Sequence, residues 1–214
     1  MPSWTPLDNK LKLTTVEVDK AAGVTDDPLL TDIGSYQRLI GRLLYLTLKA
    51  RSWVCSTDIE SILIGVKEVT YGSCYKVVRY VTIESARGIL FSSKRENKLV
   101  AYCDADWASC PNTRRSVTRF LIKYGGSLIS WRSKKQTTIS RNSVESEYKS
   151  MASTVLELVW IIALFKELGE ELESVDLFCD SKAALQRAAS PVYHVRKKHV
   201  EMIVILFERR YKRD

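Results

Sequence analysis

The chain of 214 residues is long enough for one domain, or for one domain with a smaller appendage, with a sizeable buried core. Its 45% hydrophobic and 27% charged residues are ordinary for a globular protein and argue against a disordered chain. The formal charge of +8 favours a polyanionic partner, although charge by itself does not choose between nucleic acid and an anionic membrane surface.

The first part of the chain, residues 1–87, is predicted to be mainly helical. Scattered prolines and aspartates predict an irregular lead-in over the first thirty or so residues. Leucines and isoleucines at helical spacing then predict a helix over Tyr36–Thr47. Two further helices are predicted over Asp58–Val69 and Tyr75–Ile83.

From residue 88 the pattern changes to short apolar runs separated by turns, and residues 88–214 are predicted to form a second domain. The predicted strands are Gly88–Phe91, Leu99–Cys103, Val117–Tyr124, Ser127–Arg132 and Val175–Cys179. The predicted helices run from Asn142 to near Gly169, over Ser181–Ala189 and over Lys197–Arg210. This order predicts an α/β fold, a mixed sheet flanked by helices, in which the strands before Asp104 and Asp180 lie side by side.

Local signals support two of these elements. Gly125 and Gly126 between two predicted strands indicate a hairpin. Asn142 is a predicted N-cap for the long helix, with Glu145 reaching back in a capping box. The apolar stripe of that helix consists of Val144, Tyr148, Met151, Val155, Leu158, Val159, Ile162 and Phe165.

Carboxylates are the candidate catalytic residues of this chain, because its cysteines and histidines do not form a recognisable site. Five scattered cysteines without a C-x-x-C pair, and only two histidines, argue against a zinc module, a disulfide framework or a histidine-based metal site. The same cysteine usage favours a reducing compartment, the cytoplasm or the nucleus. The N-terminus lacks an apolar signal core, and no uninterrupted apolar run is long enough to span a bilayer, so no membrane is expected as a partner.

Three acids are predicted to converge. Asp104 and Asp180 each follow a predicted strand, and Glu147 lies in the first turn of the long helix. Ligands gather beyond the carboxyl ends of adjacent strands in an open α/β sheet. Three clustered carboxylates repel one another unless a hard cation neutralises them. We therefore predict that Asp104, Glu147 and Asp180 bind divalent metal, where two Mg²⁺ ions activate water and stabilise the leaving oxygen of a phosphodiester.

Simpler explanations stay open for each residue. Asp104 is equally a turn former after its strand, Asp180 a cap for the helix that follows, and Glu147 a solvated helix residue. Basic side chains near the predicted site fit either phosphate contacts along a duplex or a solvated hairpin face. These basic residues are Arg114, Arg115, Lys134, Lys135 and Arg141.

Long strings around these residues resemble the ribonuclease H region of Ty1/copia-type retrotransposon Pol polyproteins. They are AYCDADWA from Ala101, TRRS from Thr113, LISWRSKKQ from Leu128, SRNSVESEY from Ser140, CDSKA from Cys179 and PVYHVRKKHVE from Pro191. The first half is similar to the end of the same family's reverse transcriptase and its connection, through TPLD from Thr5, YQRLIGRLLYLT from Tyr36 and VRY from Val78.

The resemblance implies a ribonuclease H-like fold for the second domain and a reverse transcriptase remnant for the first. It implies that Asp104, Glu147 and Asp180 are the catalytic, metal-binding acids, with two Mg²⁺ or Mn²⁺ ions. It also implies that the substrate is the RNA strand of an RNA–DNA hybrid.

The chain also departs from that family's pattern. The family usually continues into a further strand and a closing aspartate, whereas this sequence stops at Asp214, and Ile203 stands where the family typically has aspartate. The sequence lacks the Tyr-x-Asp-Asp motif of a polymerase, so no polymerase activity is expected. We therefore expect a C-terminally truncated, diverged copy. Three outcomes stay open: impaired metal-dependent cleavage, non-catalytic nucleic-acid binding, and failure to fold stably.

Overall fold

The chain divides into two compact units in a computed structural model. The first unit comprises Met1–Ile89 with Cys110–Arg114, and the second comprises Leu90–Ser109 with Arg115–Asp214. The structure describes residues 16–23, 28, 30–48, 67–83, 89–93 and 96–189. The helix predicted over Lys197–Arg210 therefore lies outside the described residues, as does the family-like string that begins at Pro191.

Most of the described residues of the first unit lie in helices. These are α1 (Val16–Ala22), α2 (Ile33–Leu48) and α4 (Glu68–Ile83). The prediction of an irregular lead-in is wrong for the residues of α1, which form a short helix. The helix predicted from Tyr36 begins three residues earlier, because Asp32 caps it: its Oδ1 accepts a hydrogen bond of 2.9 Å from the Ser35 N–H.

The two helices predicted to end at Val69 and begin at Tyr75 are in fact joined, because both residues lie in α4. Residues 58–66 of the earlier prediction lie outside the described residues. Gly72 and Ser73 suggest a break, yet the helix continues because its buried side packs against α2. The buried residues of this small core are Tyr36, Ile40, Leu43, Cys74 and Val77.

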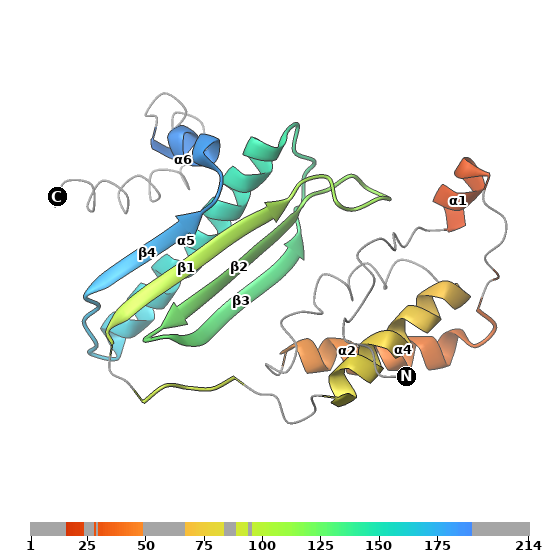
Figure 1. Cartoon of the computed structure of the whole chain (residues 1–214), viewed down its shortest axis with the longest axis horizontal. Coiled ribbons are helices and arrows are strands. Elements are labelled where there is room, and N and C mark those ends of the chain that lie inside the picture. The colour runs from red at the N-terminus through yellow and green to blue at the C-terminus, as the bar shows by residue number, and fades with distance from the viewer. Residues whose placement is uncertain are drawn as a thin grey trace. The chain divides into compact units, whose positions relative to one another are not determined.

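The second unit has the predicted α/β fold, a mixed four-stranded sheet flanked by helices (Figure 1). Its strands are β1 (Lys98–Asp106), β2 (Val117–Tyr124), β3 (Ser127–Lys135) and β4 (Ser174–Cys179). They lie in the order β3-β2-β1-β4, and β4 is parallel to β1 while β2 is antiparallel to both of its neighbours. The predicted pairing of the strands that carry Asp104 and Asp180 is confirmed.

The hairpin between β2 and β3 is also confirmed. Gly125 and Gly126 both have positive φ, +52° and +82°, as a two-residue hairpin turn of this hand requires. β3 continues three residues past its predicted end at Arg132, so Lys134 and Lys135 belong to this strand.

The strand predicted over Gly88–Phe91 is wrong for the three residues that the structure describes. Ile89, Leu90 and Phe91 have no strand structure, and Leu90 and Phe91 are 87% and 70% exposed. A short apolar run carries no alternation that distinguishes a strand from a connecting segment.

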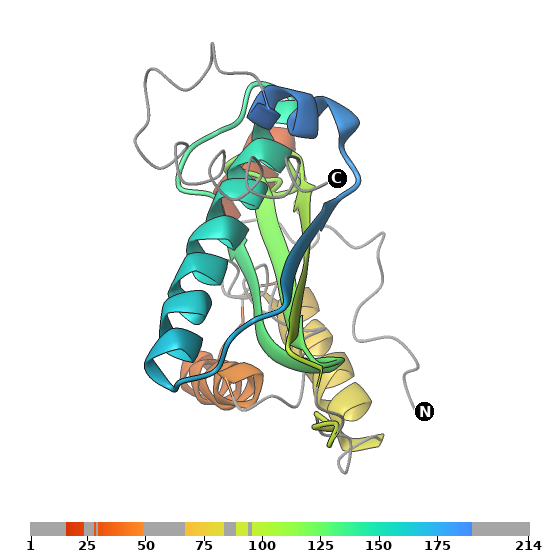
Figure 2. The same ribbon diagram turned by 90° about the vertical axis from the view of Figure 1, so that its left-hand side faces the viewer.

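Helix α5 (Ser143–Glu167) covers one face of the sheet, and the shorter α6 (Lys182–Ala189) packs beside it (Figure 2). Their common core with the sheet contains Leu99, Ala101, Cys103, Phe120, Ile122, Met151, Val155, Leu158, Ile161, Ala184 and Ala188. Of the described helices, α5 alone is long and apolar enough to cross a membrane, a property that core helices share. Here its apolar stripe packs against β1 and β2.

The N-terminus of α5 is capped as the sequence predicted. Asn142 Oδ1 accepts a hydrogen bond of 2.8 Å from the Glu145 N–H. The Glu145 carboxylate reaches back to the Arg141 N–H at 2.9 Å, one residue beyond the expected Asn142 N–H. These contacts fix where the helix begins, and therefore where its first-turn side chains lie relative to the sheet.

Candidate metal centre

Asp104 lies inside a strand. The prediction that its strand ends there is wrong, because β1 continues to Asp106. Neighbouring residues of a strand face opposite sides of the sheet, so Cys103 and Ala105 are buried under α5 while the Asp104 side chain is 52% exposed. Its Oδ2 lies 3.6 Å from the Arg119 guanidinium on β2. A turn-forming role for Asp104 is therefore excluded.

Glu147 projects from the start of α5 into the interior. It is only 9% exposed, which rules out the solvated alternative. One carboxylate oxygen, Oε1, accepts a hydrogen bond of 3.2 Å from the Ala105 N–H of β1. The other, Oε2, is buried and has no hydrogen-bond partner. A buried carboxylate oxygen without a partner is energetically unfavourable, and a bound cation would relieve that cost.

The surroundings of Glu147 favour its neutral form in the absence of metal. Burial raises the pKa of this carboxyl to about 7, although the Ala105 N–H opposes the increase. The negative charges of Asp104 and Asp180 raise the same pKa further. Both aspartates are thus close enough to Glu147 to act on it electrostatically. A cation among the three acids would reverse this effect.

Asp180 follows the last residue of β4 directly. The helix after it is capped by Ser181, whose Oγ accepts a hydrogen bond of 3.2 Å from the Ala184 N–H. Asp180 is therefore not needed as the cap, which was the simpler explanation of this residue. One carboxylate oxygen each from Glu147 and Asp180 lies within 4.8 Å of the other and of Cys179 Sγ.

The structure thus brings Glu147 and Asp180 into direct proximity, while Asp104 is outside that close group and pairs with Arg119. The two close carboxylates, one with an unpartnered buried oxygen, fit a hard divalent cation such as Mg²⁺. Asp104 belongs to the same electrostatic cluster through its effect on Glu147.

The predicted basic residues do not share one face. Lys134 and Lys135 are consecutive in β3 and so point to opposite sides of the sheet. Arg115 and Arg141 are exposed in the second unit, whereas Arg114 is exposed in the first and has a positive φ of +54°.

Sequence reasoning missed two residues at this site, Cys179 and Ser150. Ser150 Oγ donates a hydrogen bond of 2.7 Å to the Asp104 carbonyl oxygen. The Cys179 position carried a usable signal, because both acid-bearing parallel strands place a cysteine directly before the aspartate. Ser150 carried no such signal, since its role depends on helix packing, and the pairing of Arg119 with Asp104 depends on strand register.

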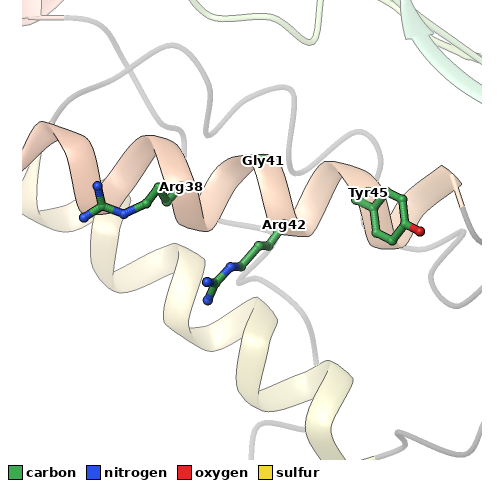
Figure 3. Close-up of a pocket in the computed structure, with 4 residues that line it drawn as sticks. All are labelled: Arg38, Gly41, Arg42 and Tyr45. Carbon is green, nitrogen blue, oxygen red and sulfur yellow. The ribbon is translucent and has the colours of Figure 1, made fainter.

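A separate cavity of about 510 Å³ lies in the first unit. Arg38, Gly41, Arg42 and Tyr45 line it from one face of α2 (Figure 3). These lining residues include no carboxylate, so we assign this cavity no role in metal binding by Asp104, Glu147 and Asp180.

Comparison with known proteins finds retrovirus-related Pol polyproteins of transposons among the relatives of this chain, two of them over most of its length. The retrovirus-related Pol polyprotein from transposon RE2 of Arabidopsis thaliana is 32% identical over 203 residues, which is 94% of this chain and 13% of that protein. The corresponding polyprotein from transposon RE1 is 32% identical over 173 residues, 80% of this chain and 12% of the relative. That from transposon TNT 1-94 of Nicotiana tabacum is 34% identical over 104 residues, 49% of this chain and 8% of the relative.

The chain therefore spans only a small part of these curated relatives. No protein-family model matches it, and no solved structure matches it.

Proposed function

Because the chain belongs to the family of retrovirus-related Pol polyproteins of copia-type transposons, we propose that its second unit is a ribonuclease H-type nuclease. Its substrate would be the RNA strand of an RNA–DNA hybrid, and its cofactor two Mg²⁺ or Mn²⁺ ions. The observation that carries the proposal is the buried Glu147 carboxylate, which has one unpartnered oxygen and lies within 4.8 Å of the Asp180 carboxylate.

The acids have distinct parts in this proposal. Glu147 and Asp180 would hold the ions between α5 and the end of β4, and Asp104 would complete the site from β1. When bound, two divalent ions activate water and stabilise the leaving oxygen of a phosphodiester. Glu147, whose Oε1 is anchored by the Ala105 N–H, would keep its free oxygen directed at the ions.

The substrate would be held by its phosphates. Arg115, Lys134 and Arg141 are exposed cations of the same unit, and cationic side chains contact phosphates irrespective of sequence. We place this activity in the cytoplasm or nucleus, where such a hybrid forms and where the cysteines stay reduced.

The test is cleavage of a labelled RNA–DNA hybrid by the purified full chain with Mg²⁺ or Mn²⁺. Asp104→Asn, Glu147→Gln and Asp180→Asn are each expected to reduce cleavage at least about a hundredfold, because each removes several kcal/mol of charge stabilisation. Asp106→Asn is the matched control, since Asp106 lies on the same strand and also pairs with Arg119, at 3.3 Å. The proposal fails if folded wild-type protein does not cut, or if the three variants cut as well as the control.

A second candidate function is binding of nucleic acid without cleavage. It is favoured by one observation, the pairing of Asp104 with Arg119 outside the close group of donor atoms. Hybrid binding that weakens with added salt, together with no metal-dependent cutting, would support this alternative.

A further inference from the structure

The candidate metal centre contains a sulfur atom that a magnesium site does not use. Cys179 Sγ, one oxygen of Glu147 and one oxygen of Asp180 all lie within 4.8 Å of one another. Cys179 is the last residue of β4, and its register partner on β1 is Cys103, which faces the core beneath α5. Strand alternation therefore directs the Cys179 side chain to the side from which Glu147 enters.

A second observation points independently to a ligand at this position. The Glu147 side chain is nine-tenths buried, and its Oε2 has no hydrogen-bond partner. Its other oxygen is already engaged by the Ala105 N–H, so the free oxygen is the one available to an ion. A buried carboxylate in this condition is stabilised by coordinating a cation.

The three donor atoms, one sulfur and two oxygens, indicate which kind of ion the site would bind. Mg²⁺ is hard and takes oxygen ligands, whereas a thiolate favours softer ions such as Zn²⁺. We propose that Glu147, Cys179 and Asp180 form a binding site for a thiophilic divalent ion of the zinc type. One sulfur and two oxygens leave a fourth tetrahedral position open to water.

The distances are compatible with such coordination. Zinc bonds of about 2.3 Å to sulfur and about 2.0–2.2 Å to oxygen, meeting at a tetrahedral angle, place two donors about 3.4–3.6 Å apart. Donors that lie within 4.8 Å of one another would have to approach by up to about 1 Å to close around the ion, a movement that side-chain rotation can supply. On binding, the Cys179 S–H bond breaks, the sulfur–metal bond forms, and the proton passes to water.

The site has a consequence for the proposed nuclease. A zinc-type ion and Mg²⁺ would compete for Glu147 and Asp180, so Zn²⁺ would inhibit magnesium-dependent cleavage. This consequence rests on the proposed function, whereas the binding of the ion does not.

Cd²⁺ is the probe for the test, because a cadmium–thiolate bond gives an ultraviolet charge-transfer band that carboxylate coordination lacks. The reduced full chain is titrated with Cd²⁺, and Zn²⁺ binding is measured separately by calorimetry. Cys179→Ser replaces the proposed donor. Cys103→Ser is the matched control. The Cys103 thiol donates to the Phe178 carbonyl oxygen at 3.5 Å and also hydrogen-bonds the Cys179 side chain, but it is not among the three grouped donors, and serine keeps a hydroxyl for both contacts.

We expect a band that saturates at one equivalent in wild type, persists in Cys103→Ser and disappears in Cys179→Ser. Zn²⁺ binding should weaken at least about tenfold in Cys179→Ser and in Glu147→Gln, since loss of even an outer partner of a metal ligand costs about that much. Circular dichroism checks that each variant is folded. The site is overturned if wild type gives no band, if the band survives in folded Cys179→Ser, or if Glu147→Gln binds Zn²⁺ as wild type does.

Failure of this site and failure of the nuclease proposal remain distinguishable. A cadmium band without magnesium-dependent cleavage would support the zinc-type site alone. Cleavage by wild type without a cadmium band would support the nuclease alone.

Discussion

Ser150 Oγ donates a hydrogen bond of 2.7 Å to the carbonyl oxygen of Asp104, which ties α5 to the strand that carries this acid. Ser150 is fully buried and lies three residues after Glu147, on the helix face that meets the sheet. The same hydroxyl lies 3.3 Å from the Arg119 carbonyl oxygen on β2. One side chain thus fixes the helix that presents Glu147 against the two strands that hold Asp104 and Arg119.

Replacing this hydroxyl should destabilise the second unit. Ser150→Ala leaves a buried carbonyl without its donor, so we expect a loss of about 1–3 kcal/mol in the free energy of unfolding. Ser153→Ala, a partly exposed position on the same helix, is the control and should change it by less than about 0.5 kcal/mol. Urea unfolding followed by circular dichroism measures both, and equal effects would contradict the assigned role of Ser150.

The stability of the metal-free protein should depend on pH through Glu147. Burial raises the folded-state pKa of this carboxyl to about 7 from an ordinary value of 4.5, so the folded protein holds the proton more tightly than the unfolded chain. The resulting stabilisation is complete below about pH 4.5 and is lost as the pH rises through about 7.

Glu147→Gln, which stays neutral, isolates this contribution. Relative to the variant, wild type should lose stability between about pH 4.5 and about pH 7, measured by urea unfolding in a chelator. Adding Mg²⁺ above that range should restore part of the loss in wild type, because an ion that binds only the folded state stabilises it. If the difference in free energy of unfolding between wild type and Glu147→Gln does not change with pH, Glu147 ionises as an exposed glutamate does.

Removing Arg119 should strengthen binding of Mg²⁺. Its guanidinium pairs with Asp104 at 3.6 Å and with Asp106 at 3.3 Å, and it competes with a cation for Asp104. The side chains are about half exposed, and exposed pairs contribute about 0.2–1 kcal/mol, so Arg119→Gln should raise the affinity by up to about fivefold. Calorimetry measures this against Arg115→Gln, which removes an equal charge elsewhere. An affinity that falls in Arg119→Gln would mean that Arg119 holds Asp104 in place for the metal.

The cap of α5 should contribute measurably to stability. Asn142→Ala removes the acceptor for the Glu145 N–H and should cost about 0.5–2 kcal/mol. Asn142→Asp keeps a side-chain oxygen in that position and should differ from wild type by no more than a few tenths of a kcal/mol. Thermal unfolding of the three proteins compares them, and similar losses in both variants would assign the effect to something other than the cap.

Local patterns determined much of the second unit. The alternation and the Gly125-Gly126 turn predicted the bounds of β2 and the start of β3 correctly. The Asn142 cap and the apolar stripe located α5, although the stripe omitted Ile161, which is buried. Such signals depend on residues close together in the sequence, where turn, cap and periodicity act directly on the backbone.

Patterns failed where burial or pairing with distant residues decides the outcome. Leu90 and Phe91 are apolar yet exposed. Helix α4 continues through Gly72 because one side of it, with Cys74 and Val77, is buried against α2. β1 extends past Asp104 because it pairs with β2 as far as Asp106 and Val117.

The sequence by itself determined the element order from β1 to α6, the mixed sheet and the three acids as candidates, because periodicity, tight turns and helix caps depend on residues close together in the chain. Only the tertiary structure decided which atoms meet. Parallel pairing of β1 with β4, strands separated by a hairpin and a 25-residue helix, sets Cys179 and Asp180 beside Glu147. The same packing buries Glu147 and leaves its Oε2 without a hydrogen-bond partner. Burial of a side chain and the positions of its hydrogen-bond donors depend on residues that are far apart in the sequence.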